Sequence, residues 1–256
     1  MTDRRVSLPS PRRRLLSVGL LLAASILVVA TGFLFLTDEG YAVRVWLWQL
    51  VQYRQLHEAE QKAADALTQR GLLVISEEPD KCVSSVNFCG KAVGADAIEL
   101  LPALYRLQSL TLSHSKITDE QLVCVSHMPQ LSSLVLAGTP IGDDGLLHLQ
   151  GLRNLEALHL SGTKVTDAGL ARLAALHSLA ILNLSDTQVT DQGLPQLLPL
   201  KQLAHLLLIH DRITDAGLVQ LEALPNLKRL SLEGTKVTAA GIARLKKAKP
   251  ALVVDR

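Results

Sequence analysis

The sequence predicts an α/β solenoid of about seven coils, preceded by a single transmembrane helix. Three observations lead to this prediction. Apolar residues recur with a period of 24 residues from Val83 onward. Within each period, a short alternating segment is followed by apolar residues at helical spacing. A separate stretch near the N-terminus, residues 15–36, is long, apolar and uncharged.

The repeat is regular enough for each position in it to be numbered. Segments with the spacing L-x-x-L-x-L begin at Leu107, Leu131, Leu155, Leu179, Leu203 and Leu227, and a degenerate copy begins at Val83. Counting each first residue as position 0, positions 0, 3, 5, 10, 15, 18 and 21 are Val, Ile, Leu, Met or Phe in 48 of 49 cases, with Ala248 as the exception. Because the whole chain is only 48% hydrophobic, composition does not explain this pattern. A fixed period of this length indicates coils that bury their apolar faces against one another.

Each coil is expected to contain one strand and one helical segment. Positions 3 and 5 are apolar, while positions 2 and 4 face the other way, as in a strand. Positions 15, 18 and 21 follow helical spacing, which predicts a short helix or helical turn. Parallel strands about 4.8 Å apart would make seven coils roughly 30 Å long, with the sheet inside and the helices outside.

The units resemble those of bacterial leucine-rich-repeat proteins, which read L-x-x-L-x-L-x-x-T-x-V-T-D-x-G-L-x-x-L. The resemblance covers about residues 83–248 and is closest in LEALHLSGTKVTDAGLARL (155–173) and LAILNLSDTQVTDQGLPQL (179–197). It implies a right-handed α/β horseshoe, similar to that of ribonuclease inhibitor, that is used for binding.

The N-terminal segments predict a membrane anchor. As a helix, residues 15–36 would span roughly 33 Å, which matches the apolar core of a bilayer. Residues 1–14 carry five arginines and Asp3, which predicts a basic cytoplasmic tail and places the repeats on the outer, periplasmic or extracellular, side. Small residues at 28–30 leave a cleaved signal peptide as the alternative.

The remaining segments are expected to join the anchor to the solenoid and to close its two ends. Residues 37–57 predict a juxtamembrane helix, whose aromatic residues form either a hydrophobic face or an interfacial belt (Tyr41, Trp46, Trp48 and Tyr53). Residues 58–82 predict an N-terminal cap, made of a helix that ends at Gly71 and a short strand. Pro250 is expected to end the last helix, and residues 249–256 to add an edge strand.

Charge and motif content exclude several function classes. The chain has a net charge of +2, of which residues 1–14 contribute +4, so the rest is slightly acidic and lacks the basic face expected of a nucleic-acid-binding protein. No G-x-S-x-G, H-E-x-x-H, P-loop or G-x-G-x-x-G motif is present, so the sequence predicts a protein without enzymatic activity or cofactor. Free thiols are favoured for Cys82, Cys89 and Cys124, although a Cys82–Cys89 disulfide would indicate a hairpin in the first unit.

A Thr-Asp-x-Gly motif recurs at positions 11, 12 and 14, as in Thr166, Asp167 and Gly169. Thr is a good helix N-cap, Asp suits the first helical turn, and Gly permits close approach of the neighbouring coil. The alternative is a calcium-binding row of aspartates. Because each coil supplies one carboxylate and calcium takes six to eight oxygens, we favour capping. In the six units from Leu107 onward, position 8 holds a row of hydroxyl side chains expected to satisfy buried backbone groups, with Asp211 as the exception.

Candidate functional residues lie at positions 2, 4, 6 and 7, which we expect on the inner face of the sheet. Asp186 and His210 share a position in adjacent coils and should be close, as should His205 and Arg229. A surface for a protein, peptide or glycan partner is favoured over a transition-metal site made of His159, His205 and His210. The predicted partner-binding residues are His114, His159, Asn183, Asp186, His205, Leu207, Ile209, His210, Arg229 and Glu233. The alternative function is a structural element of the cell envelope without a single high-affinity ligand.

Overall fold

The structure is a computed structural model that describes residues 38–77, 82–90 and 95–256. The chain forms two compact units, residues 1–57 and 58–256. The expected basic tail (1–14) and the expected transmembrane segment (15–36) lie outside the described residues. Within the described part, no helix combines the length and the apolar character needed to cross a membrane.

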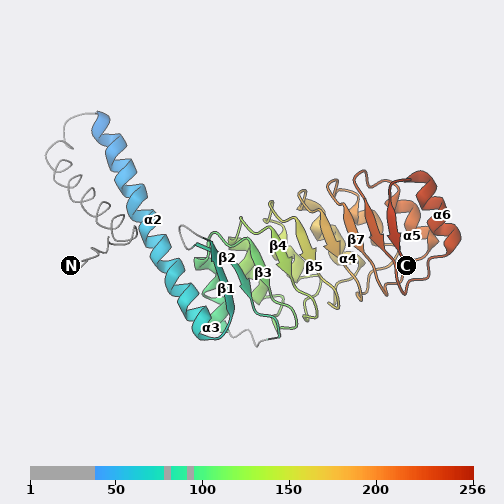
Figure 1. Cartoon of the computed structure of the whole chain (residues 1–256), viewed down its shortest axis with the longest axis horizontal. Helices are drawn as coiled ribbons and strands as arrows, with labels where there is room; N and C mark the ends of the chain where they lie inside the picture. Colours follow the sequence, from blue (N-terminus) through green and yellow to red (C-terminus); the bar gives the residue numbers. More distant parts are fainter. Residues whose placement is uncertain (1–37, 78–81, 91–94) are drawn as a thin grey trace, which may run out of the picture. The chain divides into compact units, whose positions relative to one another are not determined.

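The repeats form a single nine-stranded sheet in which the strand order follows the sequence (Figure 1). β1 pairs with β2 in antiparallel orientation, and every later pair is parallel. Partners in the parallel pairs lie one repeat apart, as in Leu182 and Leu206, so the sequence period sets the register. The strands are β1 (Leu73–Glu77), β2 (Cys82–Asn87), β3 (Ser109–Thr111), β4 (Ser133–Val135), β5 (Ala157–His159), β6 (Ile181–Asn183), β7 (His205–Leu207), β8 (Arg229–Ser231) and β9 (Val253–Asp255). We name each coil after its strand.

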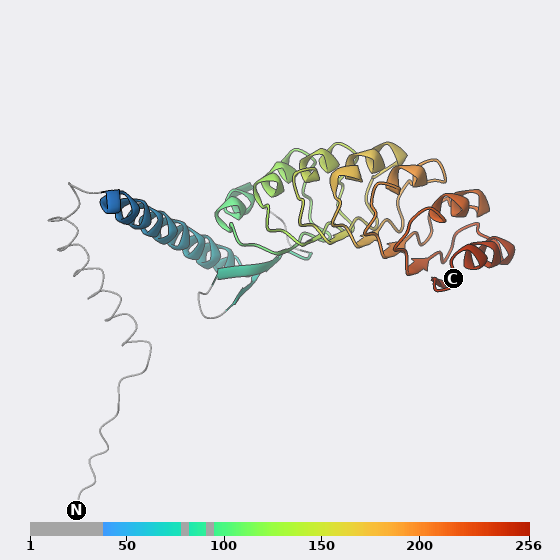
Figure 2. The same ribbon diagram turned by 90° about the horizontal axis from the view of Figure 1, so that it is seen from above.

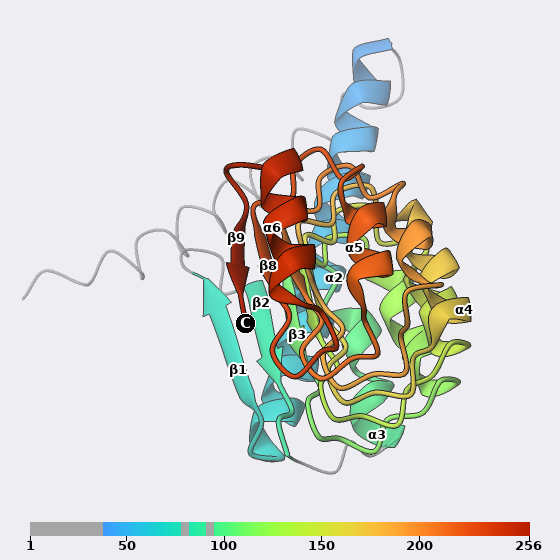
Figure 3. The same ribbon diagram turned by 90° about the vertical axis from the view of Figure 1, so that its right-hand side faces the viewer.

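Short helices form the second half of each coil and gather on one side of the sheet (Figures 2 and 3). Several are 3-10 helices, which advance further per residue than α-helices and so suit a short return path. Regular α-helices of seven and ten residues appear in the last two coils as α5 and α6. The helical segments are α3 (Ala95–Ile98), η1 (Leu101–Ala103), η2 (Gln121–His127), η3 (Gly145–Leu149), α4 (Asp167–Leu170), η4 (Ala171–Ala175), η5 (Leu194–Leu197), α5 (Asp215–Leu221) and α6 (Ala239–Ala248).

The core is a set of stacked leucine rows between the sheet and the helices. The central residue of each strand from β3 to β8, such as Leu182, is fully buried, and so are most of the other periodic positions. Burying a leucine side chain contributes roughly 1.5–3 kcal/mol. Since each side chain packs against its equivalents one coil away, the stabilisation comes from contacts between neighbouring coils.

At the N-terminal end, β1 and the last part of α2 (Asp38–Gln69), from residue 58 on, cover the first coil, with Ala63, Ala64 and Leu67 buried in the core. α2 is one helix that crosses the boundary expected between residues 37–57 and 58–82. It ends in a Schellman motif, with Gly71 at a φ of 73° and Leu72 N–H donating to the Leu67 carbonyl at 3.2 Å. Leu67 is buried, and the buried Glu60 accepts the Val83 N–H at 2.9 Å through Oε1. The helix end at Gly71 is therefore as predicted.

At the C-terminal end, α6 ends at Ala248, two residues before Pro250. β9 then pairs with β8 as the edge strand expected there. Cys89 is exposed and Cys124 is buried, and both are free thiols.

Candidate functional site

One face of the sheet is left uncovered by the helices (Figure 2). In β3 to β7 the central residue is buried and its two flanking residues are half-buried. We call the surface formed by these flanking residues, by their equivalents Arg229 and Ser231 in β8, and by position 6 after each strand the open face. Five of the predicted partner-binding residues lie on its strands: His159, Asn183, His205, Leu207 and Arg229. Position 6 adds Ile209 and Glu233.

The open face changes in character along the solenoid. β3 and β4 present small side chains, as in Ser109 and Ser133. From β6 onward the side chains are larger. Ile181, His205, Leu207 and Ile209 lie on adjacent coils, and we call them the Leu207 patch. Sequence analysis omitted Ile181, although its position 2 was the available signal.

The remaining three predicted residues lie neither on a strand nor at position 6. His114, Asp186 and His210 occupy position 7, where φ is +56° to +62° in these residues. Gly90, Gly138, Gly162 and Gly234 occupy the same position in other coils, also at positive φ. We call position 7 the turn row. These residues lie where the chain leaves the sheet, because the backbone turns there into the left-handed region that favours glycine. The expectation that position 7 lies on the sheet face was therefore wrong.

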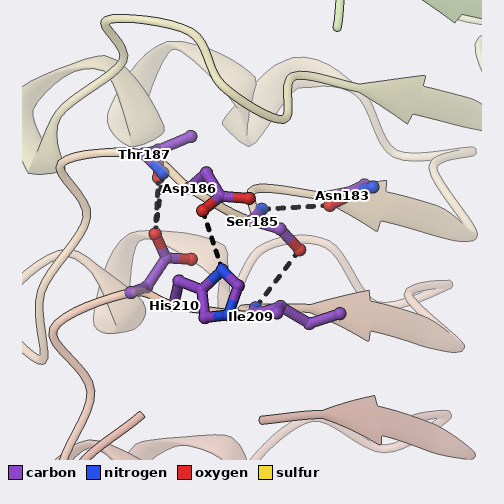
Figure 4. Close-up of polar contacts among 7 residues, drawn as sticks. Asn183, Ser185, Asp186, Thr187, Ile209 and His210 are labelled. Carbon is purple, nitrogen blue, oxygen red and sulfur yellow. Dashed lines mark hydrogen bonds and ion pairs between the residues drawn. The ribbon is translucent and has the colours of Figure 1, made fainter. Parts of the chain in front are cut away.

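Asp186 and His210 are in contact, as their shared position predicts. His210 Nδ1 lies 2.9 Å from Asp186 Oδ1, and both side chains are more than half exposed (Figure 4). The imidazole of His210 also covers Gly234, since a Cβ at that glycine would come within 3.0 Å of the ring. His114 covers Gly138 in the same way. Each histidine therefore leans onto the next coil.

Buried polar groups lie beneath this pair. Ser185 Oγ accepts the Ile209 N–H at 3.2 Å (Figure 4). Asp211 Oδ1 accepts the Thr187 N–H at 2.9 Å. Burial raises the pKa of Asp211 to about 6, and the negative charge of Asp186 adds to this rise. The β6 and β7 coils are thus joined by a polar network at the rim of the Leu207 patch.

Asn183 also belongs to this network, since its Oδ1 accepts the Ser185 N–H at 3.0 Å (Figure 4). Arg229 pairs in register with His205, but its Nε contacts Asp255 Oδ2 at 3.1 Å, a partner that sequence analysis missed. Partial burial lowers the pKa of His159. No group of three or more His, Cys, Asp or Glu side chains that could hold a metal was found among the described residues.

The Thr-Asp-x-Gly motif proves to be a contact between coils, which we call the Thr–Asp–Gly row. Each Asp accepts both the N–H (2.7–2.9 Å) and the hydroxyl (2.5–2.6 Å) of the Thr one coil later. The pairs are Asp143–Thr166, Asp167–Thr190, Asp191–Thr214 and Asp215–Thr238. Three of these threonines, Thr166, Thr214 and Thr238, also act as helix N-caps; Thr166 Oγ1, for example, accepts the Ala168 N–H and Thr214 Oγ1 accepts the Ala216 N–H. The predicted capping is confirmed, and the carboxylates are used in bonding the coils together.

The glycine of the motif makes room for that carboxylate. A Cβ at Gly193 would come within 3.0 Å of Asp167 Oδ1, and Gly145, Gly169, Gly217 and Gly241 are in the same situation. The β3 coil is the first that carries the Thr-Asp pair, and it has Gln121 at position 14, where the later coils have glycine. The coil before it, the β2 coil, has no Asp at position 12. Gly therefore occurs where the preceding coil supplies an Asp.

Comparisons with known proteins agree with this architecture. The family model described as Leucine Rich repeat matches residues 151–174 and 175–194. The two matched segments are leucine-rich repeats. A search of curated proteins found no match.

One solved structure of a bacterial protein shares the fold, and two more are similar at lower TM-scores. An internalin (inlF) of Listeria monocytogenes superposes with a TM-score of 0.56 at 22% identity, over 71% of this chain and 51% of that one. An internalin C2 of the same species (TM-score 0.49, 22% identity) is matched over 77% of this chain and 91% of that one. A leucine-rich-repeat protein of Leptospira interrogans (TM-score 0.49, 22% identity) is matched over 62% and 45%. This chain spans about half of the first of these, and the similarity concerns the fold alone.

Proposed function

We propose that this leucine-rich-repeat protein is a non-catalytic, membrane-anchored module that binds a protein partner through the C-terminal half of its open face. One observation carries the proposal. An uncovered sheet face bears small side chains over β3 and β4, and then the apolar Ile181, Leu207 and Ile209 next to the exposed Asp186–His210 pair. Apolar anchors with a polar rim are typical of the centres of protein interfaces.

A site-specific cross-linking experiment tests this proposal. The full chain is expressed in its native host with p-benzoylphenylalanine in place of Leu207, and is irradiated in intact cells. The matched control places the same residue at Leu147, which is 42% exposed in η3, on the helical side of the sheet. We expect one discrete protein adduct from position 207 that is absent from position 147. Equal adducts at both positions, or no adduct at position 207, would overturn the proposal.

A second pair of variants tests whether the patch drives the binding. Leu207→Asp combined with His210→Ala places a charge in the patch and removes the imidazole from its rim. We expect the double variant to lose the partner captured from solubilised membranes by the wild-type chain. Leu147→Asp, which makes the same change on the helical side, should retain that partner. A mixture of envelope proteins that is unchanged in all variants would favour the scaffolding alternative.

We propose further that residues 15–36 anchor the chain and that the repeats face away from the cytoplasm. The 22 uncharged residues and the five preceding arginines support this orientation. Cys89 offers a direct test, since it is an exposed free thiol, whereas burial of Cys124 raises its pKa to about 11 and slows its alkylation. In a Cys82→Ser variant, a membrane-impermeant maleimide should label Cys89 while the cytoplasmic membrane is intact. Labelling that requires lysis of that membrane would overturn the orientation.

A further inference from the structure

The hydroxyl row at position 8 has a defined hydrogen-bonding role. Thr139, Thr163 and Thr235 lie where each coil leaves its turn, and the first two are buried. Each donates its hydroxyl to the carbonyl of the leucine three residues earlier, at 2.6 Å in all three cases. Position 8 therefore calls for a side chain that can donate a hydrogen bond within its own coil.

Asp211 occupies this position in the β7 coil and is only 3% exposed. Its Oδ1 accepts both the N–H (2.9 Å) and the hydroxyl (3.2 Å) of Thr187 in the preceding coil. Its Oδ2 is also buried and has no hydrogen-bond partner among the described residues. Thr187 thus directs its hydroxyl to Asp211, where three other threonines of the row direct theirs to a leucine carbonyl.

Ionised and protonated Asp211 differ in how well they fit this site. A carboxylate can only accept hydrogen bonds, so ionised Asp211 leaves a buried charged oxygen without a donor, which is unfavourable. A proton on Oδ2 removes the charge and supplies a hydroxyl donor of the kind that the other coils have. Oδ1 keeps its bonds to Thr187 in either state.

The charged groups around Asp211 can be assigned coil by coil. The preceding coil contributes Asp186, whose charge disfavours ionisation of Asp211. The β7 coil, to which Asp211 itself belongs, contributes His210, which favours ionisation. The next coil presents Gly234 and Thr235 at the matching positions, and neither of these is ionisable.

We propose that Asp211 is a proton-binding site built into the joint between the β6 and β7 coils. The folded protein holds the Asp211 carboxyl group protonated in mildly acidic solution, and release of the proton loosens the joint. The site lies beside the Leu207 patch, since Ile209 and His210 directly precede Asp211 in the chain. The inference does not depend on the proposed binding function, because its test measures stability alone.

The direction of the pH effect follows from linkage. Burial raises the pKa of Asp211 from 3.8 to about 6, so folding takes up a proton between these values. The stability that Asp211 contributes is complete below the unfolded pKa and is lost as the pH rises through about 6. In full, the effect corresponds to about a hundredfold change in the unfolding equilibrium constant.

Asp211→Asn isolates this effect, since the amide keeps the shape of the protonated carboxyl group and supplies a donor at every pH. Urea unfolding of the full chain in detergent is followed by circular dichroism at pH 7.5 and pH 5. We expect the unfolding constant of the wild type, relative to that of Asp211→Asn, to fall about tenfold on going to pH 5. Asp211→Thr restores the residue of the row, and serves the same purpose if the Asn variant does not fold.

Asp144→Asn, at a side chain that is 82% exposed, is the matched control and should show no such pH-dependent difference. A carbon-13 titration of the Asp211 carboxyl carbon, assigned by its absence in Asp211→Asn, should give a midpoint near pH 6. The proposal is overturned if that carboxyl group titrates near pH 4. It is also overturned if the unfolding constant of the wild type differs from those of Asp211→Asn and Asp211→Thr by the same factor at pH 7.5 and pH 5.

Discussion

Two parts of the repeat line up from coil to coil, and they differ in regularity. The Thr–Asp–Gly row makes the same pair of hydrogen bonds at four successive junctions, with N···O distances of 2.7–2.9 Å. The turn row and the adjacent hydroxyl row are irregular, with His114, Asp186 and His210 replacing glycine and Asp211 replacing a hydroxyl residue. A contact that every coil needs is repeated in the sequence. Departures from the repeat show where one coil differs from the others, and three of the four fall in the β6 and β7 coils.

The largest expected effect tests the regular row. Gly193→Ala would place a Cβ against Asp167 Oδ1, and the carboxylate can yield only by giving up its bonds to Thr190. We expect the free energy of unfolding, measured in urea, to fall by about 3 kcal/mol. Gly151→Ala is the matched control, because its Cβ would meet nothing within 4 Å, and it should change stability by less than about 0.5 kcal/mol.

Removing the carboxylate should have the next largest effect. Asp167→Ala leaves Thr190 without its two acceptor contacts and should reduce the free energy of unfolding by about 2 kcal/mol. It also removes the group that Gly193→Ala would strike. The double variant should therefore lose about 2 kcal/mol, and not the sum of the two losses. Additive losses would show that Gly193 is required for a reason other than Asp167.

The regular contacts were largely predictable from the sequence. The recurrence of Leu110, Leu134 and Leu158 gave the strand positions and the parallel register, since one repeat separates paired residues. Thr166 was predicted as an N-cap and acts as one. The partner of Asp167 was missed because a motif within one coil does not show which coil its side chains contact. Each Asp at position 12 is followed 26 residues later by a Gly in the next coil, and this pairing was the signal that the Asp side chain contacts the next coil.

The irregular row was predicted less well. The expectation that strand alternation continues to position 7 placed His114, Asp186 and His210 on the sheet face. Glycine at the same position in four coils was the signal for a left-handed turn. Asp211 was noted as a departure, but its burial and its unpartnered Oδ2 depend on packing between coils that no single segment of sequence reveals. The helix type was also not predictable, since 3-10 and α-helical turns bury the same apolar spacing.

The smallest expected effect separates backbone strain from packing in the turn row. Gly162 has a φ of +66°, and the nearest atoms to an added Cβ are 3.7 Å away, which is ordinary contact. Gly162→Ala should therefore reduce the free energy of unfolding by about 1 kcal/mol through strain alone. Gly162→Asn should cost less, because Asn tolerates the left-handed region better, as do the Asp and His found at this position in other coils.

Gly138→Ala extends the comparison, since φ is +67° there and the added Cβ would also strike the His114 ring. Gly138→Ala should destabilise the protein more than Gly162→Ala does. When His114→Gly is added to Gly138→Ala, the ring is gone, and the loss of stability should fall to the part that comes from backbone strain alone.

If Gly162→Ala is neutral, the turn row does not impose a cost on non-glycine residues. His114, Asp186 and His210 would then be ordinary choices at position 7. If the cost appears, each of these residues is kept in the β3, β6 and β7 coils against about 1 kcal/mol of backbone strain. Asp186 and His210 recover part of that cost through the contact they make with each other beside the Leu207 patch.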